Sequence, residues 1–88
     1  MKIYKTMLRE FLSTYAEAFR EDRHLSQEQM AEKLRITPRA YSNLKCGRCC
    51  FSILPLLSLL LLLDSKEFEV FQSTLQGKMS TLETAHET

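Results

Sequence analysis

The sequence predicts an all-α fold of five helices, and three observations support this class. The 88 residues include only two glycines and two prolines, too few for a loop-rich β-sandwich or a disordered chain. Apolar residues recur at three- and four-residue steps, without the alternation of a strand. Residues that cap helix starts stand between these stretches. Since 44% of the residues are hydrophobic, we expect one small domain over residues 1–76 and a flexible polar tail over 77–88.

Two helices are predicted in the first part of the chain. Residues 6–22 place six apolar side chains at helical spacing, with charged residues between them: Leu8, Phe11, Leu12, Tyr15, Ala16 and Phe19. Ser26 and Gln29 have the spacing of a capping box, which predicts a second, short helix over residues 27–34.

A third helix is predicted to begin at Pro38. Thr37 is its expected N-cap, and Pro38 suits the first helical position because its missing N–H is not needed there. Gly47 is expected to end this helix in a left-handed conformation.

Two more helices follow in the second half of the chain. Ser52 opens a helix that runs to Leu63, with Pro55 inside the first turn, where proline is tolerated. Asp64 and Glu67 form a second capping box, which predicts a fifth helix that ends at Gly77.

Basic residues gather in the middle of the chain, although the formal net charge is only +1. Residues 33–50 include no acidic side chain and five basic ones: Lys33, Arg35, Arg39, Lys45 and Arg48. A segment of this kind favours an anionic partner, and all five are candidates for contacts to phosphates.

The second and third predicted helices have the pattern of a helix-turn-helix DNA reader. Ala31 is the small residue where they cross, and the inward set is Met30, Leu34, Ile36, Tyr41 and Leu44. Residues 25–48, LSQEQMAEKLRITPRAYSNLKCGR, closely resemble the phage repressor and Cro family of helix-turn-helix regulators, also called the xenobiotic-response-element family. The resemblance extends over about residues 8–75 and implies a five-helix, phage-repressor-like DNA-binding domain.

This resemblance implies a set of DNA-binding residues. Gln27 would contact a phosphate and brace a base-reading side chain. Arg39 could pair with guanine and Asn43 with adenine, while Lys45 and Arg48 would hold backbone phosphates. The whole expected set is Gln27, Thr37, Pro38, Arg39, Ser42, Asn43, Lys45 and Arg48.

Three residues depart from the family pattern. His24 and Arg35 stand where relatives usually have glycine, so a left-handed backbone there would cost about 1–2 kcal/mol. Lys45 replaces an acidic residue that in many relatives pairs with the arginine corresponding to Arg20. We therefore expect a like-charge pair there, with both cations free for phosphate.

The three cysteines, Cys46, Cys49 and Cys50, lie within five residues. Their odd number does not suit a secreted disulfide framework, and with no secretory signal at the N-terminus we expect a cytoplasmic protein. A structural zinc site needs four ligands, so no metal and no other cofactor is expected. Burial as small hydrophobic side chains is the expected role, and a thiol switch favoured by Arg48 is the alternative.

The fourth predicted helix has more leucine than one core stripe can use. Leu56, Leu59, Leu60 and Leu63 provide the inward stripe, which leaves four leucines for a homodimer interface: Leu54, Leu57, Leu61 and Leu62. Alternatively, the fifth helix and tail fold back over them. The apolar run over residues 49–63 would span about 22 Å, short of the ~30 Å hydrocarbon core, so no membrane span is expected.

The expected function is a sequence-specific, homodimeric transcriptional regulator of duplex DNA, acting as a repressor. The alternative is a protein-interaction module, such as an antitoxin or adaptor, that uses the leucine-rich helix on another polypeptide. A cysteine-dependent redox or metal sensor is a third candidate. The histidines are isolated and no serine or carboxylate arrangement supports catalysis, so an enzyme is not expected.

Overall fold

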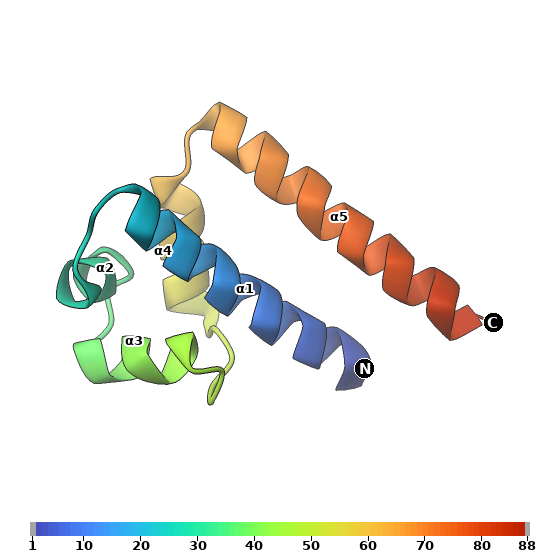
Figure 1. The fold of residues 1–88 in the computed structure, drawn as a ribbon, viewed down its shortest axis with the longest axis horizontal. Helices are drawn as coiled ribbons and strands as arrows, with labels where there is room; N and C mark the ends of the chain where they lie inside the picture. The colour runs from blue at the N-terminus through green and yellow to red at the C-terminus, as the bar shows by residue number, and fades with distance from the viewer. Residues whose placement is uncertain (1, 88) are drawn as a thin grey trace.

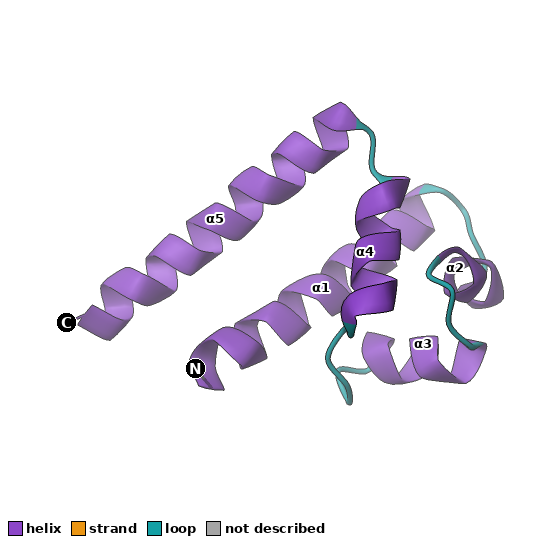
Figure 2. Ribbon diagram, turned by 180° about the vertical axis from the view of Figure 1, so that it is seen from behind, coloured by secondary structure: helices purple, strands orange, loops and turns teal. Residues whose placement is uncertain are grey.

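The computed structural model describes residues 2–87 and, for side chains, residues 3–84. These residues form five helices: α1 (Lys2–Asp22), α2 (Gln27–Lys33), α3 (Pro38–Lys45), α4 (Ile53–Leu62) and α5 (Ser65–Glu87). The predicted all-α class is confirmed for this part of the chain. The two long helices, α1 and α5, run in opposite directions, and α2 and α3 lie at the end of the molecule away from the two chain ends (Figures 1 and 2).

One buried core joins all five helices. Met30, Ala31 and Leu34 of the α2 region are completely buried, and Leu59 of α4 is as well. The expected inward set is confirmed, with Ile36 the one member that is only partly buried. Helices of seven and eight residues are not stable alone, so this packing keeps α2 and α3 folded.

The predicted caps of α2 and α3 are confirmed. The Ser26 hydroxyl accepts the Gln29 N–H at 3.0 Å, and the Gln29 side chain accepts the Ser26 N–H at 2.8 Å. The Thr37 hydroxyl accepts the Ala40 N–H at 3.1 Å. After α3, Gly47 has a φ of 75°, and the N–H of the next residue, Arg48, donates to the Asn43 carbonyl at 2.9 Å. This is a Schellman turn, so both ends of α3 are defined by local hydrogen bonds.

The predicted end of the fifth helix at Gly77 is wrong, because α5 continues to Glu87 through most of the expected tail. Its predicted start is confirmed by reciprocal hydrogen bonds between Asp64 and Glu67, at 2.7 and 3.1 Å. A glycine inside a helix costs only about 0.5–1 kcal/mol relative to alanine, and it need not end the helix. Leu75, Met79 and Leu82 continue the three- and four-residue spacing across Gly77, and each is partly shielded from solvent.

The expected burial of the cysteines is also wrong. Cys46, Cys49 and Cys50 are all exposed free thiols, in the connection from α3 to α4. Such connections run over the surface, and here Phe51 is the residue that packs against the core. Among the residues that the structure describes, no three histidine, cysteine or acidic side chains are grouped so that they could hold a metal ion.

Helix α4 buries one stripe and exposes another. Leu59 is buried, and the other predicted inward leucines, Leu56, Leu60 and Leu63, pack against the core. Leu62 was expected to face outward but packs against the core too, because it lies three residues after Leu59 on the same side of the helix. The outward face consists instead of Ile53, Leu54, Leu57 and Leu61, whose exposed fractions are 76%, 54%, 52% and 76%. In the described part of the chain, no helix combines the length and apolarity that a membrane crossing requires.

Both expected left-handed residues are confirmed. His24 has a φ of 56° and Arg35 a φ of 63°. The Arg35 guanidinium also donates to the hydroxyl of Ser58 at 2.9 Å, and Ser58 is buried in α4. Arg35 therefore combines a strained backbone with a side chain that ties the α2–α3 turn to α4.

The two left-handed residues predict different effects of the same substitution. His24→Gly should raise the free energy of unfolding by about 1 kcal/mol, because glycine adopts a left-handed backbone without strain. The gain is smaller than the strain removed, because glycine also increases the conformational entropy of the unfolded chain. Arg35→Gly relieves the same strain but removes the donor to buried Ser58, a loss of about 1–3 kcal/mol. Urea unfolding of both variants measures the difference. An equal gain in both variants would show that the Arg35–Ser58 hydrogen bond contributes nothing.

Candidate nucleic-acid interface

Helices α2 and α3 present one polar surface, and residues 34–37 form the turn between them. At the start of α3, Thr37, Pro38 and Arg39 are exposed. One turn later, Ser42 and Asn43 are half-buried; they lie three and four residues after Arg39 and so share its side of the helix. Tyr41 and Leu44 face the core from the opposite side. The structure thus brings the expected base-reading residues together on the outer face of α3.

The remaining expected contacts border this face. Gln27 is half-buried at the first position of α2, and Arg48 is exposed two residues beyond the C-cap of α3. Lys33, at the end of α2, is exposed as well. Within the described residues, the side chains of Lys33, Arg39 and Arg48 form neither an ion pair nor a hydrogen bond. Their positive charges are therefore available to an anionic partner.

Lys45 is placed differently from the other cations. It is half-buried and lines a shallow groove against α1, together with Glu17 and Glu21. Its charge helps to lower the pKa of the Glu17 carboxyl. Because these carboxylates attenuate its charge, Lys45 is a weaker candidate for a phosphate contact than Arg39 or Arg48.

Arg20 does not form the expected like-charge pair with Lys45, and it is not free for phosphate. Its guanidinium donates two hydrogen bonds to the Glu17 carboxylate, at 2.8 and 3.0 Å, and a third to the Leu25 carbonyl at 2.9 Å. The buried Tyr41 of α3 donates its hydroxyl hydrogen to the same carboxylate. Glu17, one turn from Arg20 on α1, thus supplies the acidic partner that we expected to be missing.

This hydrogen-bonded cluster of Glu17, Arg20 and Tyr41 holds α3 against α1. Hydrogen bonds from Arg20 are the main reason that the pKa of Glu17 lies below its ordinary value of 4.5. Burial is the main reason that the pKa of Tyr41 is raised, and the hydrogen bond to the Glu17 carboxylate adds to it. Both shifts favour an ionised Glu17 and a neutral Tyr41, which are the forms that the hydrogen bonds need.

Arg35 also makes a contact within the protein, although the residue is exposed. Its guanidinium is engaged by Ser58 of α4, at 2.9 Å. Sequence reasoning missed this role, because a serine inside an otherwise aliphatic helix carries no sign of a partner 23 residues away.

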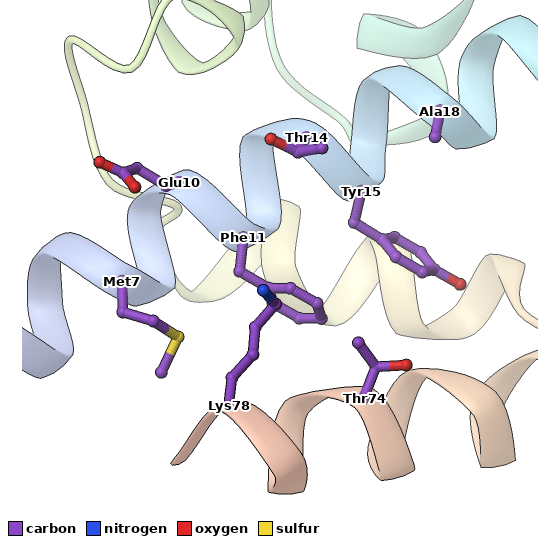
Figure 3. A pocket seen from close by; sticks show the side chains of 8 residues that line it. All are labelled: Met7, Glu10, Phe11, Thr14, Tyr15, Ala18, Thr74 and Lys78. Atoms are coloured by element: carbon purple, nitrogen blue, oxygen red, sulfur yellow. The ribbon is translucent and has the colours of Figure 1, made fainter. Parts of the chain in front are cut away.

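A separate concavity lies between α1 and α5 (Figure 3). It encloses about 440 Å³ and has Met7, Phe11 and Tyr15 on one side and Thr74 and Lys78 on the other. The Lys78 ammonium reaches over the Phe11 ring, 5.9 Å from its centroid. With apolar walls and one carboxylate, Glu10, at its edge, the groove is suited to an apolar side chain rather than to acid–base chemistry.

The lowered pKa of Glu17 predicts part of the acid sensitivity of the fold. A carboxyl with a depressed folded pKa stabilises the native state above its ordinary pKa, and this contribution is lost as the pH falls through the folded value. Glu17→Gln should lower the free energy of unfolding at pH 7 by about 1–3 kcal/mol. The variant should then lose less stability than the wild type between about pH 6 and pH 3. Urea unfolding at each pH, with exposed Glu10→Gln as the control, measures this; parallel pH profiles for wild type and Glu17→Gln would contradict it.

The candidate interface therefore consists of the outer face of α3, the start of α2 and the cations at Lys33 and Arg48. The cluster of Glu17, Arg20 and Tyr41 supports it from behind. Comparisons of the chain with protein-family models, with curated proteins and with solved structures found no match.

Proposed function

We propose that this chain is a sequence-specific duplex-DNA-binding transcriptional regulator, a repressor, in which α2 and α3 act as a helix-turn-helix. One observation carries the proposal. Two short, capped helices, α2 and α3, pack on a common core. They present exposed cations that have no partner among the described residues: Arg39 on α3 and Arg48 just beyond it. The resemblance of residues 25–48 to the phage repressor and Cro family supports the same function.

The dimensions of α3 suit the major groove. An α-helix with its side chains is about 10–12 Å across, and the major groove of B-DNA is about 12 Å wide. In this arrangement the exposed N-terminal residues of α3, Pro38 and Arg39, approach base edges first. Arg39 carries donors for the O6 and N7 of guanine, and Asn43, one turn later, can pair with adenine.

Phosphate contacts come from the edges of the interface. Arg48 is the last residue of the Schellman turn, and its backbone N–H donates to the Asn43 carbonyl at 2.9 Å. Lys33 extends from the end of α2, and Gln27 stands at its start. Contacts of this kind position the protein without reading sequence, so they determine affinity for every duplex.

A homodimer would place two such helices on one site. The outward face of α4 consists of Ile53, Leu54, Leu57 and Leu61, and no charged side chain occurs anywhere in α4. Two copies of this aliphatic face are complementary to each other across a two-fold axis. Symmetric half-sites need recognition helices about 34 Å apart, and a dimer supplies two of them.

A second candidate function rests on the same exposed face. As an antitoxin or adaptor, the chain would place Ile53, Leu54, Leu57 and Leu61 on an apolar surface of a different polypeptide. The two functions differ in the free protein: a regulator that dimerises through α4 is already a dimer without its partner, whereas an adaptor is not.

The DNA-binding proposal predicts different effects of replacing Arg39 and Arg48. After selection of a preferred site from a random duplex pool, Arg39→Ala should lose about 1–3 kcal/mol of discrimination at one base pair. Arg48→Ala should weaken binding to all sequences about equally and reduce the salt slope by about one. Gel shifts at several salt concentrations measure both effects. Lys66→Ala is the control for loss of charge, because Lys66 is exposed on α5, outside the proposed interface. Unchanged affinity in both arginine variants would refute the assignment of α3.

The dimer proposal predicts that replacing outward leucines of α4 affects dimerisation, whereas replacing an inward leucine affects folding stability. Leu57→Lys and Leu61→Lys should dissociate the dimer while the helical content stays the same, because both side chains are more than half exposed. Leu59→Ala should instead lower folding stability by about 2–5 kcal/mol, since Leu59 is completely buried. Light scattering and circular dichroism distinguish the two. A wild-type protein that stays monomeric at high micromolar concentration would refute the homodimer and favour the adaptor.

A further inference from the structure

Three exposed thiols stand together beside the proposed DNA interface. Free cysteine is among the most buried residue types, yet Cys46, Cys49 and Cys50 are all exposed. They lie within five residues, and the core does not use them. Neither the fold nor the proposed DNA contacts explain why thiols occupy these positions.

Two of these cysteines bracket the turn that positions Arg48. Cys46 is the C-cap residue of α3, and Cys49 follows Arg48 directly. Between them, Gly47 adopts its left-handed conformation, and its N–H donates to the Leu44 carbonyl at 3.1 Å. The connection that holds them projects beside the end of α3, on the side of the molecule away from α5 (Figure 1). Any covalent link between Cys46 and Cys49 therefore acts on the backbone that carries Arg48.

We propose that Cys46 and Cys49 form an oxidation-sensitive pair whose disulfide weakens DNA binding. The inference rests on the proposed function and adds its regulation. Closing a ring over Gly47 and Arg48 constrains the two residues that complete the Schellman turn. The Arg48 N–H then cannot keep its hydrogen bond to Asn43 without strain, and the guanidinium turns away from the phosphate it would contact.

Sequence spacing favours one pairing, and covalent geometry disfavours another. Disulfides join residues whose Cα atoms are about 4.4–6.8 Å apart, whereas adjacent Cα atoms are only about 3.8 Å apart. This disfavours a bond between the neighbours Cys49 and Cys50. Cys46 and Cys49 have the two-residue spacing of the redox-active C-x-x-C motif. Cys50 stays a free thiol in the oxidised protein.

The oxidant is a hydroperoxide. The thiolate of one cysteine attacks the peroxide O–O bond, which breaks to leave a sulfenic acid on that sulfur and to release hydroxide. The second cysteine, having given up its thiol proton, attacks the sulfenic sulfur as a thiolate, and the S–S bond forms as the S–O bond breaks to release hydroxide. The two protons lost by the two thiols convert both hydroxides to water. Two thiols lose two electrons in total, and one hydrogen peroxide becomes two waters. A dithiol reductant reverses the change by thiol–disulfide exchange.

The test uses the full chain and a duplex selected with the reduced protein. Hydrogen peroxide is added and then removed with catalase, after which free thiols, intact mass and duplex affinity are measured. We expect the number of free thiols per chain to fall from three to one. The intact mass should be that of a single chain, not of two linked chains, and lower by two hydrogen atoms. The affinity should fall roughly ten- to hundredfold, as for loss of one charge-assisted contact, and dithiothreitol should restore it.

Matched variants separate the pair from the third thiol. Cys46→Ser and Cys49→Ser should bind DNA as the reduced wild type does and keep that affinity after peroxide. Cys50→Ser should respond to peroxide as the wild type does. All three positions are exposed, so circular dichroism should show unchanged helicity.

The outcomes distinguish this inference from the function on which it rests. If reduced protein binds no duplex, the proposed function fails and this inference fails with it. If reduced protein binds and the intramolecular disulfide forms without loss of affinity, only the inference is overturned. A disulfide between two chains, or a response that depends on Cys50, also overturns it.

Discussion

The placement of α3 depends on one buried tyrosine. Tyr41 is 1% exposed and belongs to the core in which α3 packs against α1 and α2, and its hydroxyl donates to the Glu17 carboxylate. A carboxylate at this depth needs charge compensation, which Arg20 gives from the next turn of α1. Arg20 in turn holds the carbonyl of Leu25, just before α2 begins. The cluster of Glu17, Arg20 and Tyr41 therefore links α1 to the start of α2 and to the inner face of α3. These hydrogen bonds fix the orientation of α3 and so the direction in which its outer face points.

Local signals in the sequence were sufficient for the helices around the interface. Ser26, Gln29, Thr37 and Gly47 act on backbone groups within a few residues, so their hydrogen bonds follow from spacing alone. The left-handed conformation of Arg35 was instead expected from the resemblance, because relatives usually have glycine at this position. The positions of the proposed DNA-binding residues on the outside of α3 follow from helical geometry once these boundaries are known.

Interactions between distant segments could not be predicted in this way. Tyr41 donates its hydroxyl hydrogen to the Glu17 carboxylate from 24 residues away, and only the fold brings these two side chains together. The rotation of α4 decides between Leu62 and Ile53, and that rotation depends on Pro55, Ser58 and Leu59 fitting against the other helices. The cysteines are exposed because Phe51 takes the inward position in their connection, and α5 passes Gly77 because apolar residues continue on its far side.

The course of the two long helices has a consequence for what can be attached to this chain. Helix α1 begins at Lys2 and α5 ends at Glu87, and Figures 1 and 2 show both of these ends on the side of the molecule away from α2 and the start of α3. A fluorophore, affinity handle or fused domain joined at either end would therefore project away from the proposed DNA interface. Surface immobilisation through either end would likewise leave α3 facing the solution.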